Sequence, residues 1–383
     1  MKMMPKWRQP SDHKRSICAG EALQQRKFSS PLDAAMGTRR SLTCRCGPAK
    51  PAGISRFVIP HAAAALFLGC AAASFGWAAE RVNVATQSRG LRELPVVVAL
   101  RAGFFRSEGL EVEKIYVHSD VAAKALGTGE VAFNLGWNAP LRAAISGAPL
   151  KLIAVLVGRP LHQLLARPEI RSGKDLKGKT LGVDEFFSET DFLTGVALRF
   201  LGVEPGRDVK WVEVGSGMLR LDALKAGEIH ATLTDLPAAL AFEREPLRRL
   251  LSVGDVLDLP VFGVAVSAAK LEKDRDQVRK FVRAVLRGAR FVKRNRADTV
   301  RVIQHHLKLT PGEASGAYDS AVRHFTEDGL VSDRAIALAV RRARDHPAPP
   351  KDFALDRIFD WSVAREIGAE RRKLPFWLRR YDP

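Results

Sequence analysis

Cysteine is scarce in this chain of 383 residues, and its four cysteines all lie in the first 70 positions: Cys18, Cys44, Cys46 and Cys70. The rest of the chain therefore has no disulfide and no thiol chemistry. The HExxH, CxxC, P-loop and GxSxG patterns are also missing. His305 and His306 are adjacent and would point to different faces of a helix. We therefore expect no catalytic residue, no metal site and no cofactor.

Acidic residues are outnumbered, which gives the chain a formal charge of +19. Residues 1–79 hold 12 basic and 3 acidic residues, and the remainder carries +10. Those later charges are spread along segments such as 270–296, which is typical of solvated helix faces rather than of a groove for nucleic acid. We expect no nucleic-acid partner.

Long apolar runs are confined to one place, residues 57–80, directly after Arg56. Pro60, His61 and the alanine-rich end favour a secretory signal peptide over a membrane span. Cleavage near residue 78 is the first interpretation, and lipidation at Cys70 is the second. Residues 1–79 are thus predicted to be a leader and signal peptide; Met36 offers a start that would give a leader of ordinary length.

The segment that follows predicts a strand–helix–strand unit. Residues 81–87 are rich in β-forming residues, an apolar helical pattern starts at Pro95 and ends at Gly109, and residues 110–115 alternate as a strand does. The loop Thr86–Leu94 comes before a helix N-terminus, where free backbone N–H groups and the helix dipole favour a ligand.

The strand–helix rhythm occurs twice, over about 80–160 and 180–260, and helices with basic faces follow from Lys270. This pattern predicts two Rossmann-like α/β lobes, a hinge of two crossings near 167–179 and 258–261, and a helical C-terminal tail. Lobe 1 is assigned to 80–170 and 261–383, and lobe 2 to 171–260.

Further loops also follow strands and come before helices, at 136–140, 186–191, 215–217 and 234–237. Ser188 and its neighbours are helix N-cap candidates. Trp137 has two open interpretations, core packing and stacking on a ligand. His162, His230 and His324 are isolated and are interpreted as surface or hydrogen-bonded histidines.

Five segments resemble signatures of one family: residues 99–113 (ALRAGFFRSEGLEVE), 124–136, 145–156, 174–183 and 223–231. The family is that of the periplasmic solute-binding proteins of ABC importers for nitrate, sulfonates, taurine and thiamine-pyrimidine precursors. The resemblance covers about 82–290. It implies a two-lobed periplasmic binding protein fold (type II-like), a small-molecule ligand, an inner-membrane ABC permease as partner, a periplasmic location and a monomer.

The family's ligand loops correspond here to Gln87–Leu94, Gly136–Asn138, Phe186–Thr190, Gly215–Gly217 and Thr234–Leu236. From them we predict the ligand-binding residues Ser88, Arg89, Trp137, Asn138, Ser188, Thr190, Ser216 and Asp235. Arg89 with the hydroxyls favours an organic anion such as a sulfonate or carboxylate, whereas Asp235 and Glu189 favour a cationic or hydroxyl-bearing group. The chain departs from the family at His230, where an acidic residue is common.

Three functions compete. The first is a transport binding protein that closes on an organic anion. The second is an enzyme of the same fold in pyrimidine-precursor biosynthesis, but such enzymes carry a cysteine-rich motif that this chain lacks after Cys70. The third is the sensing domain of a regulator, which needs a helix-turn-helix that residues 1–79 do not supply.

Overall fold

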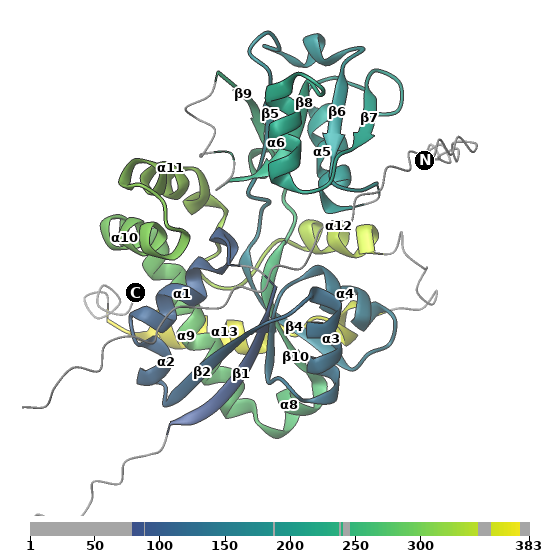
Figure 1. The fold of residues 1–383 in the computed structure, drawn as a ribbon. Coiled ribbons are helices and arrows are strands. Elements are labelled where there is room, and N and C mark those ends of the chain that lie inside the picture. The colour runs from purple at the N-terminus through teal and green to yellow at the C-terminus, as the bar shows by residue number, and fades with distance from the viewer. Residues whose placement is uncertain are drawn as a thin grey trace, which may run out of the picture. The chain divides into compact units, whose positions relative to one another are not determined.

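A computed structural model describes residues 79–375, apart from 88, 187, 237, 238, 240–245 and 344–353. The described residues form two five-stranded mixed sheets (Figure 1). The first has the strand order β2 (Leu110–Tyr116), β1 (Glu80–Thr86), β3 (Phe133–Leu135), β10 (Phe262–Ser267), β4 (Leu150–Val157). The second has the order β7 (Lys210–Glu213), β6 (Thr180–Val183), β8 (Ala231–Asp235), β5 (His162–Ala166), β9 (Arg248–Ser252).

Each sheet is parallel at one side and antiparallel at the other. Strand β1 runs parallel to β2 and β3, whereas β10 is antiparallel to β3 and β4. In the second sheet β6 runs parallel to β7 and β8, and β5 is antiparallel to β8 and β9. The parallel strands place their carboxyl ends at one edge, where ligands bind in such folds.

Alternation along the strands decides which side chains meet which helices. In the first sheet Val82 and Val84 belong to one apolar cluster and Ala85 to another. The first cluster includes residues of α1 (Leu94–Arg101), α2 (Phe104–Ser107), α9 (Arg275–Arg294) and α13 (Ser362–Lys373). The second includes residues of α3 (Ser119–Thr128) and α4 (Asn138–Ile145). Stacking of Phe133 on Phe281, with ring centroids 3.9 Å apart, fixes α9 on the sheet.

The second sheet is covered in the same way. Leu193 and Leu198 of α5 (Glu189–Phe200) pack with Leu181 and Leu233 of the sheet. Along β5, Leu164 belongs to the cluster under α5, whereas its neighbour Leu165 points to the opposite face. There Leu165 packs with residues of α6 (Gly217–Ala226). Each sheet therefore has an apolar layer on both faces, as expected for α/β lobes.

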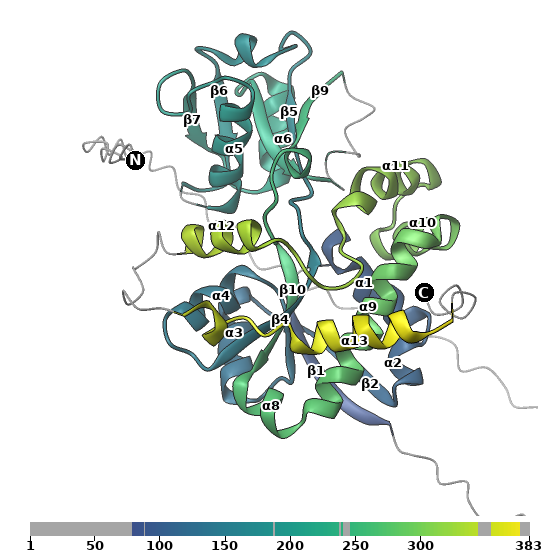
Figure 2. The ribbon, with the colours of Figure 1, turned by 180° about the vertical axis from the view of Figure 1, so that it is seen from behind.

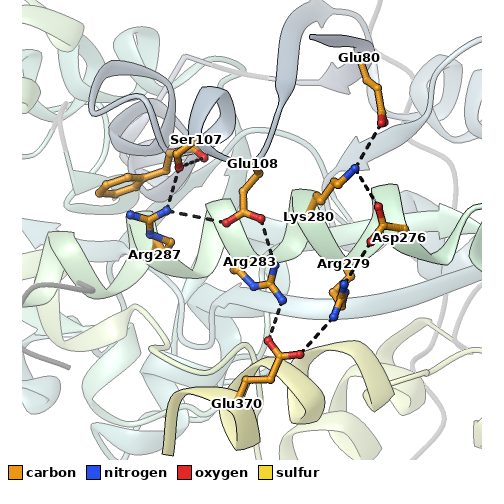
Figure 3. A network of polar contacts seen from close by, with 10 residues as sticks. Glu80, Ser107, Glu108, Asp276, Arg279, Lys280, Arg283, Arg287 and Glu370 are labelled. Carbon is orange, nitrogen blue, oxygen red and sulfur yellow. Dashed lines mark hydrogen bonds and ion pairs between the residues drawn. The ribbon is translucent and has the colours of Figure 1, made fainter. Parts of the chain in front are cut away.

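A polar network holds α9 between distant parts of the first lobe (Figure 3). Lys280 binds Glu80 at 3.3 Å, Arg283 binds Glu108 at 3.1 Å, and Arg283 also binds Glu370 of α13 at 2.7 Å. Figure 2 shows α13 lying beside α9, which agrees with these contacts. The basic residues of this helix thus form ion pairs with carboxylates of the same lobe.

The helix predicted to run from Pro95 to Gly109 is broken in two. Gly103 has φ 74°, in the left-handed region that glycine adopts without strain, and it separates α1 from α2. The correct bounds of the later helices are α8 (Ala268–Lys273), α10 (Arg296–Leu307), α11 (Pro311–Ala321) and α12 (Asp333–Ala343).

One predicted boundary is wrong. Residues 162–166 were assigned to lobe 1, but β5 pairs with β8 and β9 and so belongs to the second sheet. Strand β9 was not predicted. The chain therefore passes between the sheets at 158–161 and returns before β10, at 256–261. The second crossing was predicted at 258–261, and the first comes earlier than predicted because β5 fills a place between two strands of the second sheet.

No helix among the described residues is long and apolar enough to span a membrane. The same residues contain no group of three or more His, Cys, Asp or Glu side chains arranged to hold a metal ion. The leader, the cleavage site near residue 78 and Cys70 lie outside the described residues.

Candidate functional site

The loop after β1 is anchored by a buried carboxylate. Glu93, which is fully buried, accepts hydrogen bonds from Thr86 Oγ1 at 2.6 Å and from Lys114 Nζ at 2.8 Å. It closes a short 3-10 helix, η1 (Leu91–Glu93), and is followed by Pro95 in the first turn of α1. Thr86 of β1 and Lys114 of β2 therefore hold this loop in place through hydrogen bonds to the charged Glu93.

Two arginines of this loop, Arg89 and Arg92, stand at the edge of the first sheet. Arg89 is exposed, and its guanidinium lies over the ring of Tyr116, 4.6 Å from the ring centroid. Such stacking holds the guanidinium in place without using its N–H donors. Arg89 can therefore still bind an anion.

These arginines line a cleft of about 290 Å³. One wall is made of Arg89, Gly90, Leu91 and Arg92, and the other of Leu161, His162, Asp235 and Leu236. The second wall comes from the first crossing and from the ends of β5 and β8, which pair at His162 and Asp235. The cleft thus joins residues of both sheets.

A larger hollow of about 450 Å³ lies elsewhere, against α12, and is lined by Val256, Leu257, Asp258, Arg334, Ala337, Leu338 and Arg341. None of its lining residues belongs to a parallel strand or to a loop that follows one. We take the smaller cleft as the site because it combines a position at the carboxyl ends of parallel strands with buried polar groups that have no partner.

His162 is the first of these groups. Its Nδ1 exposes less than 1 Å² and has no hydrogen-bond partner. Burial lowers the pKa of His162, and Arg92 adds to this effect, whereas Glu189 and Asp235 oppose it. The imidazole is therefore neutral at neutral pH, and each ring nitrogen can take part in hydrogen bonding to a ligand.

Glu189, at the start of α5, is the second. Its Oε2 accepts a hydrogen bond from Asn138 Nδ2 at 3.4 Å, whereas its Oε1 is buried without a partner. Burial acts to raise the pKa of Glu189, but Arg92, His162 and Arg342 together bring it below its ordinary value. The side chain is thus a charged carboxylate, and its bond to Asn138 joins the second lobe to the first.

The hydroxyls of the 184–190 loop are used within the loop. Ser188 and Thr190 both donate to Asp184, and Ser188 also caps α5 by accepting from the backbone N–H of Asp191 at 3.1 Å. Burial acts to raise the pKa of Asp184, but these two hydroxyl bonds lower it. A role for Ser188 and Thr190 in ligand binding stays a prediction.

Trp137 lies in the core. It is 1% exposed, and its ring stacks on Phe359 with centroids 6.1 Å apart. Of the two interpretations of this residue, core packing describes the structure, and in this structure the ring is not offered to the cleft. Its Nε1 is nevertheless buried without a partner, as are both polar side-chain atoms of Asn134.

The predicted residues therefore fall into three groups. Arg89 and Asp235 line the cleft, and Asn138 reaches Glu189 beside it. Ser216 caps α6 through the backbone N–H of Leu219, and Ser88 lies outside the described residues. The sequence interpretation placed Arg92 only inside a broader loop, considered Glu189 as a partner for a cationic or hydroxyl-bearing group, and took His162 as a surface or hydrogen-bonded histidine.

Arg220 was missed altogether. It is 4% exposed and donates to the backbone oxygens of Gly215 and Leu233, which ties the start of α6 to β8. Burial lowers its pKa. No pattern distinguishes it from the solvated arginines of other helices, so the sequence held no signal for it.

The family model described as NMT1/THI5 like matches residues 92–298. Among curated proteins, the riboflavin-binding protein RibY from Chloroflexus aurantiacus is 30% identical over 210 residues, which are 51% of this chain and 57% of RibY. The chain thus spans a little over half the length of this relative.

Solved structures share the fold. The periplasmic aliphatic sulphonate binding protein SsuA from Escherichia coli matches with a TM-score of 0.61 at 18% identity, over 74% of this chain and 93% of SsuA. The desulfurization enzyme DSZB matches with a TM-score of 0.57 at 14% identity, over 76% of this chain and 100% of DSZB. The predicted two-lobed periplasmic binding protein fold is therefore confirmed. At these identities the likeness concerns the fold alone.

Proposed function

Because the chain belongs to the NMT1/THI5-like family, we propose that it is the substrate-binding component of an ABC-type importer. In this proposal the protein is exported to the periplasm by its leader and acts there as a monomer without enzymatic activity. It captures a small organic anion, such as a sulfonate or carboxylate, and delivers it to a permease in the inner membrane.

The observation that carries the proposal is the cleft with Arg89 and Arg92 on one wall and His162 and Asp235 on the other. Guanidinium groups match the two oxygens of a carboxylate or sulfonate with parallel N–H donors. Leu91, Leu161 and Leu236 supply the apolar surface that the organic part of a ligand needs.

Hinge closure belongs to the proposal, since the two sheets are joined by the crossings 158–161 and 256–261. Closure around a ligand is a common motion of two-lobed binding proteins. Small-angle scattering should give a smaller radius of gyration at saturating ligand, and an unchanged radius would count against closure.

Riboflavin is a second candidate ligand, favoured by the relative RibY. The carboxylates of Asp235 and Glu189 near the cleft would accept hydrogen bonds from hydroxyl groups of such a molecule. The alternative to a binding protein is an enzyme of the same fold, since the structure of the desulfurization enzyme DSZB matches this chain. The lack of cysteine after Cys70 argues against the cysteine-rich chemistry of pyrimidine-precursor synthases.

The test is native mass spectrometry of protein purified without refolding, followed by calorimetric titration with the molecule found. Titration with benzenesulfonate, benzoate and riboflavin covers the case in which nothing co-purifies. Binding of one of the two anions supports the first candidate, and binding of riboflavin alone supports the second. Saturable turnover of any of them would overturn the proposal of a binding protein.

Replacing Arg89 with alanine should weaken the binding of an anionic ligand by about 1.5–3 kcal/mol, the range for a hydrogen bond to a charged group. This corresponds to a loss of about 10- to 100-fold in affinity, read by calorimetry. Arg106, an exposed arginine of α2, provides the matched control, and Arg106→Ala should bind as the parent does. Parental affinity in Arg89→Ala would show that the anion or the loop was wrongly chosen.

A further inference from the structure

Two buried polar atoms have no hydrogen-bond partner: Nδ1 of His162, a residue that lines the cleft, and Oε1 of Glu189 at the start of α5. Each exposes less than 1 Å², although each side chain as a whole is only half-buried. Buried polar atoms are hydrogen-bonded in the large majority of cases, so two unpaired ones at one place call for an explanation.

Neighbouring groups do not satisfy them. Asn138 Nδ2 is bonded to the other oxygen of Glu189, at 3.4 Å. Arg92 lowers the pKa of Glu189, but Glu189 Oε1 has no hydrogen-bond partner among the described residues. Glu189 begins α5 shortly after β6, and His162 begins β5, opposite Asp235 at the end of β8. Because β5 and β6 both pair with β8, the two residues lie at the same edge of the second sheet.

Their chemistry indicates what would complete them. A charged carboxylate oxygen can only accept a hydrogen bond, and a neutral imidazole beside it can accept one or donate one. A ligand hydroxyl or N–H group would satisfy Glu189 Oε1, and such a bond to a charged acceptor is about twice as strong as a neutral one.

We propose that Glu189 and His162 form an edge that selects ligands carrying a hydroxyl or N–H donor, in addition to the anionic group held by Arg89 and Arg92. The cleft then has two separate recognition functions, one on each wall. Arg89 and Arg92 of the first lobe bind the anionic group of the ligand. Glu189 and His162 of the second lobe distinguish anions that carry a hydroxyl or amino group from anions that lack one. This inference rests on the proposed function, because it assumes that the cleft is the ligand site.

The test uses two probes that differ in one donor, benzenesulfonate and 4-hydroxybenzenesulfonate. Calorimetry with the full mature chain should show tighter binding of the hydroxylated probe, by about 10-fold or more, because a site built for a donor rejects the analogue that lacks it. In Glu189→Gln this preference should fall to about threefold, and in Glu189→Ala it should disappear.

Glu185, an exposed carboxylate of the same loop, gives the control Glu185→Gln, which should keep the preference. Circular dichroism and a thermal melt show whether each variant is folded. Equal binding of the two probes by the parent protein, or an unchanged preference in Glu189→Ala, would overturn this inference and leave the proposed function standing. If neither probe binds the parent protein, both this inference and the proposal that the protein binds a sulfonate are overturned.

Discussion

Lys114→Ala is expected to lower the free energy of unfolding by about 3–5 kcal/mol, the cost of leaving one charge of a buried ion pair without its partner. Lys114 Nζ is 2.8 Å from Glu93 Oε2, and the exposed fractions of the two side chains are 13% and 0%. Without the ammonium, the carboxylate of Glu93 would keep only Thr86 as a side-chain donor. Chemical denaturation monitored by circular dichroism measures the change.

Lys124, an exposed lysine of α3, provides the control, and Lys124→Ala should change stability by less than about 0.5 kcal/mol. Adding Glu93→Gln to Lys114→Ala removes the stranded charge and should recover part of the loss. A loss in Lys114→Ala no larger than that in Lys124→Ala would show that the pair does not stabilise the fold.

The same variant bears on function. Glu93 ends the short helix that carries Arg92, and the ring of Tyr116 under Arg89 also lies near Lys114 Nζ, at 5.1 Å. We therefore expect loss of this ion pair to displace both arginines of the cleft. Any such displacement weakens binding, since the N–H donors must meet two ligand oxygens at once.

The fold was largely predictable from the sequence, because alternation and glycine stops are local signals. The helix break at Gly103 was not predicted, since Val96, Leu100 and Phe104 keep their helical spacing across it. Residues 162–166 were assigned to lobe 1, whereas β5 belongs to the second sheet. The choice between sheets depends on long-range pairing with β8 and β9, which no local pattern encodes.

The site was less predictable for the same reason. Arg89 and Asp235, which line the cleft, were predicted because their loops follow strands and correspond to the family's ligand loops. His162 was interpreted as a surface or hydrogen-bonded histidine because it is isolated in the sequence, and its pairing with Asp235 is a long-range contact. The hydroxyls of Ser188 and Thr190 were proposed as ligand groups, yet both bond to Asp184 within their own loop, and sequence spacing does not distinguish these two uses.

His324 lies where the two crossings meet. Its backbone oxygen accepts from the N–H of Gly158, and its ring is 2% exposed. Gly254, in the 3-10 helix η3 (Val253–Asp255) just before the second crossing, approaches so closely that a Cβ there would lie 2.5 Å from Cε1 of the ring. His324 thus contacts the first crossing through its backbone and the approach to the second through its ring, and nothing larger than glycine fits at position 254.

This packing predicts a loss of stability in acid. Burial, reinforced by Arg323 and Arg159 and opposed by Asp255, lowers the pKa of His324 from 6.5 to about 4. Above pH 6.5 neither the folded nor the unfolded histidine is charged, so the contribution is fully present. As the pH falls from 6.5 towards 4, only the unfolded state gains a proton, and stability decreases by about 1.4 kcal/mol per pH unit.

His324→Leu should remove this dependence. The free energy of unfolding is measured for each protein by urea denaturation at pH 7.5 and at pH 4.5. Between these two pH values the parent protein should lose about 2–3 kcal/mol more than the variant. His162 and His306, whose pKa values are also lowered by burial, remain in both proteins and cancel in the comparison. His305→Leu, at an exposed position, is the control and should keep the parental slope. If the free energy of unfolding falls equally with pH in the parent and in His324→Leu, His324 does not cause the loss of stability in acid.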